Sequence, residues 1–379
     1  MTSRVAIVEL EENSQKSLKR AIELIGGIED LNTAKNNVVV KVGVFSHKVG
    51  NHTSVDLVKA ITNVFSKASK IFLTESDNYQ GTALERLQIW KDLFTERIVP
   101  FSLSDDADNK KVTLAGQEMG LSHILFKPNI LVSTHILRSF ERGSILKNLF
   151  GCIPTPKKAK FHKILAPLLA DVYEAIGGID LAVLDGTHYW YGAGALPIPM
   201  NTVLAGRDAV AVETVGATLA GLKTEKMPII QEFVKRGLGE GDLKNIEIVG
   251  ATLESLREKF KLATQQHKQK WRERGGAPKR WAPAIDNLIR EGFFKMPNKR
   301  TREDVKKSAE GQINSGGGQH ELGCDYFDEK SQERRAESSE RLRWLDLLDR
   351  ITRLVVISGR EAACKYQPCA PSRFLSCSP

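Results

Sequence analysis

Residues 37–45 read NVVVKVGVF, a run of valines interrupted by one lysine and one glycine. A short, nearly continuous apolar run of this kind is typical of a parallel strand that is buried on both faces of its sheet. The stretch NHTSVDLVKA (51–60) follows, and Thr53 or Ser54 is the expected N-cap of a helix there. Residues 70–76, KIFLTES, return to a strand pattern. The order strand, helix, strand predicts a βαβ unit.

The alternation of strand and helix patterns continues over residues 1–262. Further strands are predicted at 5–10, 124–134, 180–186 and 246–251, and further helices at 14–25, 82–94, 163–176 and 208–221. Apolar strands that alternate with helices are typical of parallel sheets covered on both faces. We therefore predict an α/β fold, an open and mostly parallel sheet with helices on both faces, joined by right-handed crossovers.

The composition of the chain changes near residue 263. Residues 263–310 hold 13 Lys and Arg against 6 Asp and Glu, so most of the formal net charge of +9 lies in this short segment. Its first part is polar and broken by Gly and Pro, which is typical of a linker. The sequence predicts an α/β domain at 1–262, a basic linker at 263–280, a small helical segment at 281–310 and a poorly ordered tail at 311–379.

The sequence lacks the motifs of several common classes of protein. The five cysteines form no Cys-x-x-Cys pair, so neither a zinc ribbon nor a ferredoxin-type iron–sulfur cluster is expected. No Gly-x-Gly-x-x-Gly turn follows a strand, and neither a P-loop nor a Gly-x-Ser-x-Gly elbow occurs. No apolar run approaches the roughly 20 residues of a membrane span, and the start shows no signal peptide. We therefore expect a cytoplasmic protein with no membrane partner.

Polar side chains gather where the predicted strands end. Ligands of open α/β sheets bind outside the carboxyl ends of the strands. Loops are polar everywhere, but acids, hydroxyls and an imidazole at several ends of one sheet favour a binding site. The candidate ligand-binding residues at these ends are Lys41, Glu75, Ser76, Asp77, His135 and Asp185.

Three further candidates lie outside the strand ends. Asp208 is the expected N-cap of the helix at 208–221, and Glu213 is a single charge among small apolar residues of that helix. Two interpretations of Glu213 are open: it pairs with a structural Lys or Arg, or it faces the site. His162 lies in the lysine-rich stretch PKKAKFHK (156–163), which either binds phosphate or an acidic ligand or is a solvated loop.

The stretch GSILKNLFG (143–151) raises a question of its own, because Lys147 and Asn148 stand inside an apolar run. Lysine is rarely buried without a partner. One interpretation is that both side chains face a site, where the lysine supplies positive charge and the amide orients a carboxylate or phosphate. The other is a core ion pair of Lys147 with Glu213 or Asp185. The first interpretation predicts that one pocket is lined by Lys41, Asp77, Lys147, Asn148 and Asp185.

Taken in order, several stretches resemble one known family, the domain-of-unknown-function family 362. The resemblance covers about residues 36–250, and ILKNLFG is its most specific single stretch. The stretches are VVVKVG, NHTSVDLVKA, TESDN, ILVSTH, ILKNLFG, FHK, LAVLDG, AGRDAVAVETVGATLAG and RGLGEGDLKNIEIVG.

The resemblance implies an α/β domain, which in this family is often attached to iron–sulfur ferredoxin modules. It strengthens the expected fold more than any reaction, because the chemistry of the family is poorly defined. The family often has Lys-Pro-Asn where Lys41, Val42 and Gly43 stand, a Lys near Leu137, and Asp in place of Glu213. No cluster-binding set of cysteines accompanies the domain here, so an iron–sulfur cofactor is not expected.

Two functions from different classes follow from these observations. The first is the binding of a small anionic ligand at the strand ends, either alone or together with a divalent metal. The second is a nucleic-acid-associated regulator that uses the basic residues 263–310, where helix–PNKRT–helix resembles half of a winged helix. The DNA-binding candidates are Lys299, Arg300, Arg302, Lys306 and Lys307. The sequence assigns no reaction.

Overall fold

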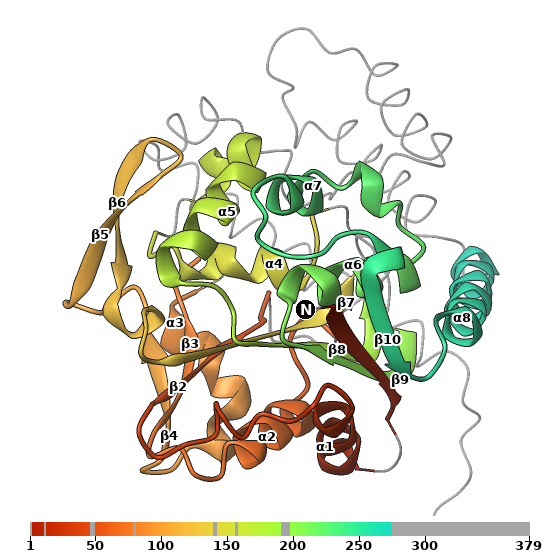
Figure 1. Ribbon diagram of the computed structural model, residues 1–379, viewed down its shortest axis with the longest axis horizontal. Helices are drawn as coiled ribbons and strands as arrows, with labels where there is room; N and C mark the ends of the chain where they lie inside the picture. Colours follow the sequence, from red (N-terminus) through yellow and green to blue (C-terminus); the bar gives the residue numbers. More distant parts are fainter. Residues whose placement is uncertain are drawn as a thin grey trace, which may run out of the picture. The chain divides into compact units, whose positions relative to one another are not determined.

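A mostly parallel sheet of eight strands forms the centre of the computed structural model (Figure 1). The structure describes residues 2–10, 13–45, 50–78, 81–138, 142–155, 158–190 and 198–273. The strand order across the sheet is β10 (Ile246–Gly250), β1 (Ser3–Glu9), β9 (Ile198–Gly206), β8 (Leu181–Trp190), β7 (Ile130–Arg138), β2 (Val38–Val42), β3 (Ile71–Glu75) and β4 (Ile98–Ser102).

One strand of this sheet runs against the others. β9 is antiparallel to both of its neighbours, β8 and β1, whereas the remaining pairs of adjacent strands are parallel. The carboxyl ends of β2, β3, β4, β7 and β8 therefore lie at the same edge of the sheet. The sequence analysis predicted this edge, and the α/β fold with a mostly parallel sheet is confirmed.

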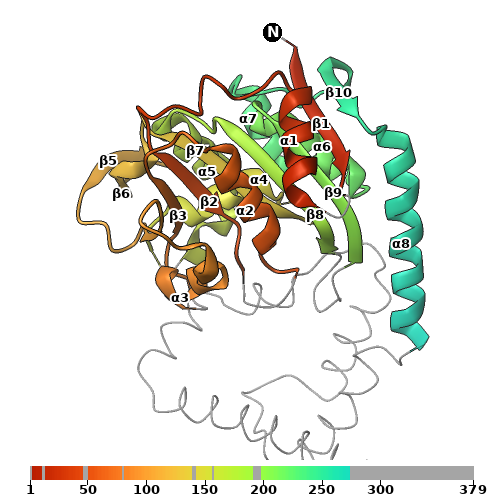
Figure 2. The ribbon, with the colours of Figure 1, turned by 90° about the horizontal axis from the view of Figure 1, so that it is seen from below.

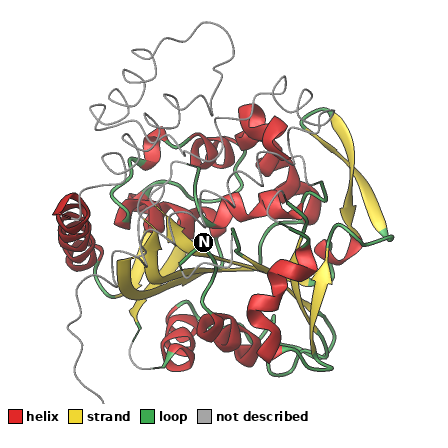
Figure 3. Ribbon diagram, turned by 180° about the vertical axis from the view of Figure 1, so that it is seen from behind, coloured by secondary structure: helices red, strands yellow, loops and turns green. Residues whose placement is uncertain are grey.

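Helices cover both faces of the sheet (Figures 1 and 3). On one face lie α1 (Ser14–Leu24), α2 (Val55–Val64) and α3 (Ala83–Leu87), which the 3₁₀ turn Gln88–Leu93 extends. On the other face lie α4 (Ile145–Asn148), α5 (Leu165–Ile176), α6 (Ala209–Leu219), α7 (Pro228–Lys235) and α8 (Leu253–Glu273). Figure 2 shows α8 running beside the sheet on the side of β9 and β10.

The two-residue period of the strands decides which side chains meet the helices of each face. In β2, Val39 packs into the core beneath α4–α8, while Val38 and Val40 pack beneath α1 and α2. Lys41 shares the parity of Val39 and so belongs to the α4 face. In β8, by contrast, Asp185 shares the parity of the residues that face α2.

Several elements differ from the prediction. The helix predicted at 14–25 spans Ser14–Leu24, and Asn13 is its N-cap. The strand predicted from residue 124 begins at Ile130, after a 3₁₀ turn at His123–Leu125. The strand β4 was not predicted, nor was the hairpin of β5 (Asn109–Leu114) and β6 (Gln117–Ser122).

The basic stretch predicted as a linker is helical where the structure describes it. α8 runs to Glu273 without interruption. All described residues belong to one compact unit. The predicted helical segment 281–310, the tail 311–379 and the five DNA-binding candidates lie outside the described residues. Along the part of the chain that is described, no helix has both the length and the apolar character needed to span a membrane.

Candidate functional site

Glu213 holds the segment that carries the GSILKNLFG sequence. Its carboxylate lies in the centre of α6 and accepts hydrogen bonds from the backbone N–H of Ser144, at 2.8 and 2.9 Å, and of Leu146, at 2.9 Å. Gly143 passes close by, and a Cβ there would lie 3.0 Å from the carboxyl carbon. Burial raises the pKa of Glu213, while the bonds from the backbone N–H groups act in the opposite direction. Glu213 thus caps the start of α4 and fixes its position over the sheet.

Asn148 and Lys41 are joined by this placement of α4. Lys41 Nζ donates to Asn148 Oδ1 at 3.1 Å, and Asn148 Nδ2 donates to the backbone oxygen of Lys41 at 2.8 Å. Asn148 Nδ2 also lies 3.2 Å from Ser133 Oγ and from the backbone oxygen of Thr134. The amide therefore links α4 to β2 and β7 and fixes the direction of the lysine ammonium group.

Glu75, at the end of β3, is the carboxylate that Lys41 contacts, with 2.9 Å between Lys41 Nζ and Glu75 Oε2. Arg86 on α3 approaches the other oxygen of Glu75 at 3.6 Å. The guanidinium of Arg86 also donates to the backbone oxygens of Val44 and Ser76. Gly151 leaves room for this arrangement, because a Cβ there would lie 2.4 Å from Glu75 Oε1 and 2.5 Å from Lys41 Nζ.

Lys158 supplies a third buried positive charge. Its Nζ donates to Ser76 Oγ at 2.5 Å and to the backbone oxygen of Asp77 at 2.9 Å, and both acceptors are formally neutral. Burial lowers the pKa of Lys158 to about 8; the charges of Lys41 and Arg86 act in the same direction and Glu75 in the opposite one. Lys158 is thus still mostly protonated at pH 7, at a high cost in desolvation.

Three buried side chains carry positive charge at this place, and we refer to them as the cation cluster: Lys41, Arg86 and Lys158. Their exposed fractions are 1%, 1% and 8%, and that of Glu75 is 4%. Three buried cations therefore surround one buried carboxylate. A protein interior seldom leaves such an excess of charge without a partner, because an unpaired buried ion costs several kcal/mol.

Two buried groups next to the cluster carry no charge at neutral pH. Burial, together with the charges of Arg138 and Lys41, lowers the pKa of His135 well below its usual value. Burial raises the pKa of the Cys152 thiol to about 11. The excess positive charge of the cation cluster is therefore not changed by His135 or Cys152.

Asp185 and Asp208 bind groups outside the cation cluster. Asp185 Oδ2 accepts from the backbone N–H of Ser54, the N-cap of α2, at 2.6 Å, and Oδ1 accepts from Thr187 N at 2.8 Å. By its parity in β8 it lies on the α2 face of the sheet, and its hydrogen bonds join β8 to the start of α2. Asp208 caps α6 by accepting from Val210 N and Ala211 N, as its predicted N-cap role required.

Lys147 and Asn148 leave α4 in different directions, as neighbours on a helix do. Lys147 is half-buried, and its Nζ lies 3.9 Å from the ring centroid of Phe150. The ring of His162 also packs on Phe150, with 5.4 Å between the centroids. The two acids suggested as core partners of Lys147, Glu213 and Asp185, instead bind backbone N–H groups. Asn148 thus belongs to the buried site, whereas Lys147 packs against an aromatic ring.

Sequence reasoning found part of the cluster and missed the rest. Lys41, Glu75, Ser76, Asp77 and Asn148 were candidates, and the structure brings them together, although the Asp77 carboxylate itself accepts from Ala83 N, at the start of α3. The signal for Lys158 was the lysine-rich stretch 156–163. Arg86 carried no signal, because a single arginine in an amphipathic helix looks like an exposed one.

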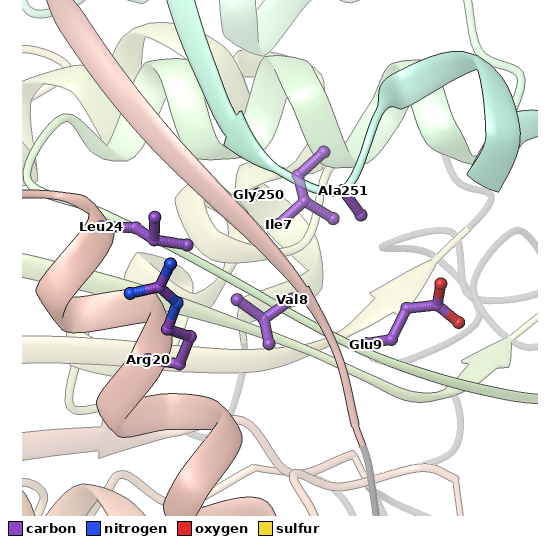
Figure 4. Close-up of a pocket in the computed structure, with 7 residues that line it drawn as sticks. All are labelled: Ile7, Val8, Glu9, Arg20, Leu24, Gly250 and Ala251. Carbon is purple, nitrogen blue, oxygen red and sulfur yellow. The ribbon is translucent and has the colours of Figure 1, made fainter.

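In the described part of the chain, the position of the cluster can be compared with the metal-ligating side chains and the surface hollows. Within the described ranges, no group of three or more His, Cys, Asp and Glu side chains could hold a metal ion. A hollow of about 290 Å³ lies near the β10 border of the sheet, between α1 and the strands β1 and β10 (Figure 4). Its charged lining residues are Glu9 and Arg20, which are opposite in sign, so it offers no concentration of one charge.

Residues 38–218 match the domain of unknown function DUF362. The match confirms the resemblance drawn from the sequence, and it spans the strands β2, β3, β7 and β8 together with α4 and most of α6. Every member of the cation cluster, Glu75, Asn148 and the capping Glu213 lie within the DUF362 region. No curated protein matches the chain.

Proposed function

We propose that the DUF362 region of this protein binds a small anionic ligand, such as a phosphate or a carboxylate, through the cation cluster. The observation that carries the proposal is the excess of buried positive charge, three cations around the single carboxylate of Glu75. Lys158 adds to it directly, because its two hydrogen-bond acceptors bring no negative charge.

The arrangement of the cluster supports this proposal in three ways. It lies at the carboxyl ends of β2 and β3, where open α/β sheets bind their ligands. Arginine and lysine together offer both planar and point-like donors for oxyanions. Asn148 and Glu75 hold Lys41 in one position, so little side-chain entropy would be lost when an anion binds.

The experiment uses the full chain with inorganic phosphate as probe. Isothermal titration and thermal unfolding are measured for the wild type, for Lys158→Met and for the control Lys163→Met, which removes an exposed lysine of the same turn. We expect phosphate to raise the Tm of the wild type and of the control and to have at most a tenth of that affinity for Lys158→Met.

Equal phosphate affinity in the wild type and in Lys158→Met would contradict the proposal, as would the absence of any phosphate or carboxylate binding to the wild type. A variant that unfolds is recognised by its low Tm without phosphate. In that case Lys158→Arg, which keeps the charge, should restore phosphate binding.

A further inference from the structure

We propose that Lys158 forms a Schiff base with a small carbonyl compound that also carries a negative charge, such as a 2-oxo acid. The inference rests on the anion site proposed above and names the class of ligand that this site takes. It assigns the lysine a chemical role in addition to its charge.

The hydrogen bonds of Lys158 suit a neutral amine. An ammonium group has three N–H donors, whereas a neutral amine has two donors and one lone pair. Among the described residues, Lys158 Nζ has two acceptors, Ser76 Oγ and the backbone oxygen of Asp77. These two acceptors satisfy both donors of the neutral amine and leave its lone pair available for a ligand.

The neighbouring hydroxyl does not compete for the role of nucleophile. Ser76 Oγ donates its own proton to the backbone oxygen of Gly151 at 2.6 Å, and its oxygen faces Lys158 as an acceptor. Ser76 is fully buried, while Lys158 keeps an exposed fraction of 8%. Lys158 is therefore the less buried residue of this pair.

The charges around Lys158 also favour a reactive amine. Lys41 on β2 and Arg86 on α3 are positive, Glu75 on β3 is negative, and the thiol of Cys152 is neutral. Burial and the two cations lower the pKa of Lys158 to about 8, so a useful fraction of the amine is unprotonated near neutral pH. Desolvation beside other cations is a known way to activate a lysine for attack on a carbonyl. The same cations would hold the carboxylate of a 2-oxo acid.

The step balances without any further reactant. The lone pair of Lys158 Nζ attacks the carbonyl carbon, and the electrons of the C=O π bond move to oxygen. The oxygen takes up the two protons that the amine nitrogen gives up and leaves as water. A C=N bond remains between lysine and ligand, and neither partner is oxidised or reduced.

The test is reductive trapping on the full chain. Protein is incubated with millimolar pyruvate, reduced with sodium borohydride and digested, and each lysine peptide is examined by mass spectrometry for one added carboxyethyl group. We expect the Lys158 peptide to be modified at least ten times faster than the Lys163 peptide, and faster as the pH rises through about 8. Inorganic phosphate should slow the modification of Lys158, and the variant Lys158→Arg should lack it.

Each outcome separates the two proposals. Modification of Lys158 no faster than that of Lys163 overturns the Schiff base, and if phosphate still binds, the anion site stands alone. Selective modification of Lys158 without any phosphate binding supports the Schiff base and contradicts a general anion site. Because the trapping is read in the wild type, a poorly folded variant does not affect the result.

Discussion

Lys41 and Asn148 are joined by two hydrogen bonds of opposite direction. The ammonium group of Lys41 donates to the amide oxygen of Asn148, and the amide nitrogen of Asn148 donates to the backbone oxygen of Lys41. The two residues come from β2 and α4, more than a hundred positions apart in the chain. This reciprocal pair connects the helix face to the sheet at the cation cluster. Its position makes it the first target for mutation.

Asn148→Leu should destabilise the protein by about 3 kcal/mol, because it leaves a buried ammonium group and several buried oxygens without their partner. Urea unfolding measures the loss. The matched control is Asn63→Leu on the exposed side of α2, which should change the free energy of unfolding by less than about 0.5 kcal/mol. Equal effects of the two substitutions would show that the reciprocal pair does not stabilise the fold.

Gly151→Ala should disrupt the ion pair of Lys41 with Glu75. The added methyl group would lie within 2.5 Å of both charged groups, a separation that real side chains do not tolerate. We expect a lower Tm together with a loss of phosphate affinity. An unchanged Tm and unchanged phosphate binding would mean that the two side chains adjust without cost.

Glu213→Ala should lower the stability by about 2–4 kcal/mol and release the start of α4, because the N–H groups of Ser144 and Leu146 lose their acceptor. Hydrogen exchange at residues 144–146 should accelerate more than at residues in α5. Glu247→Ala, which removes an exposed partner of Arg4, serves as the control. Slow exchange at 144–146 in the Glu213 variant would refute the capping role.

The pH dependence of stability should carry the signature of Lys158. Its pKa is lowered from 10.5 to about 8 in the folded protein, so the unfolded chain binds more protons between these values. The stability of the wild type relative to Lys158→Met should therefore rise as the pH increases from about 8 to about 10.5, by on the order of 3 kcal/mol. Urea unfolding at a series of pH values measures the difference. A difference that stays constant over this window would mean that Lys158 is not destabilised by its burial.

A fragment limited to residues 38–218 should not fold. It contains β9 but lacks β1, so the outer edge of β9 would lose its antiparallel partner. Circular dichroism and near-ultraviolet spectra should show a folded protein for residues 2–273 and a loosely packed one for 38–218. A cooperative unfolding transition of the shorter fragment would contradict the expectation.

Most of the predicted strands lie inside the sheet, whereas β4 lies at its edge and the β5–β6 hairpin lies outside it. Runs such as residues 38–42 are apolar on both faces and are recognised from sequence alone. β4 lies at the edge of the sheet and contains Pro100, which argues against a strand unless its place at an edge is known. The β5–β6 hairpin turns at Ala115 and Gly116, both with positive φ, and alanine is not the residue expected there.

The candidate site was only partly predictable for a related reason. The strand-end rule brought Lys41 and Glu75 together, because it depends on topology alone. The same rule could not say which face of the sheet Asp185 would take, since that depends on the register of β8. Arg86 and Lys158 joined the cluster through tertiary packing, which leaves no mark in the spacing of residues.

The place of β1 between β9 and β10 has a consequence for protein synthesis. β1 leaves the ribosome well before β9 and β10, its partners in the described sheet, so its apolar residues Val5 and Ile7 have no strand partner while nearly two hundred residues are added. At about 5–20 residues per second, this wait lasts on the order of ten to forty seconds. During that time the unpaired apolar strand is a site at which the growing chain can aggregate.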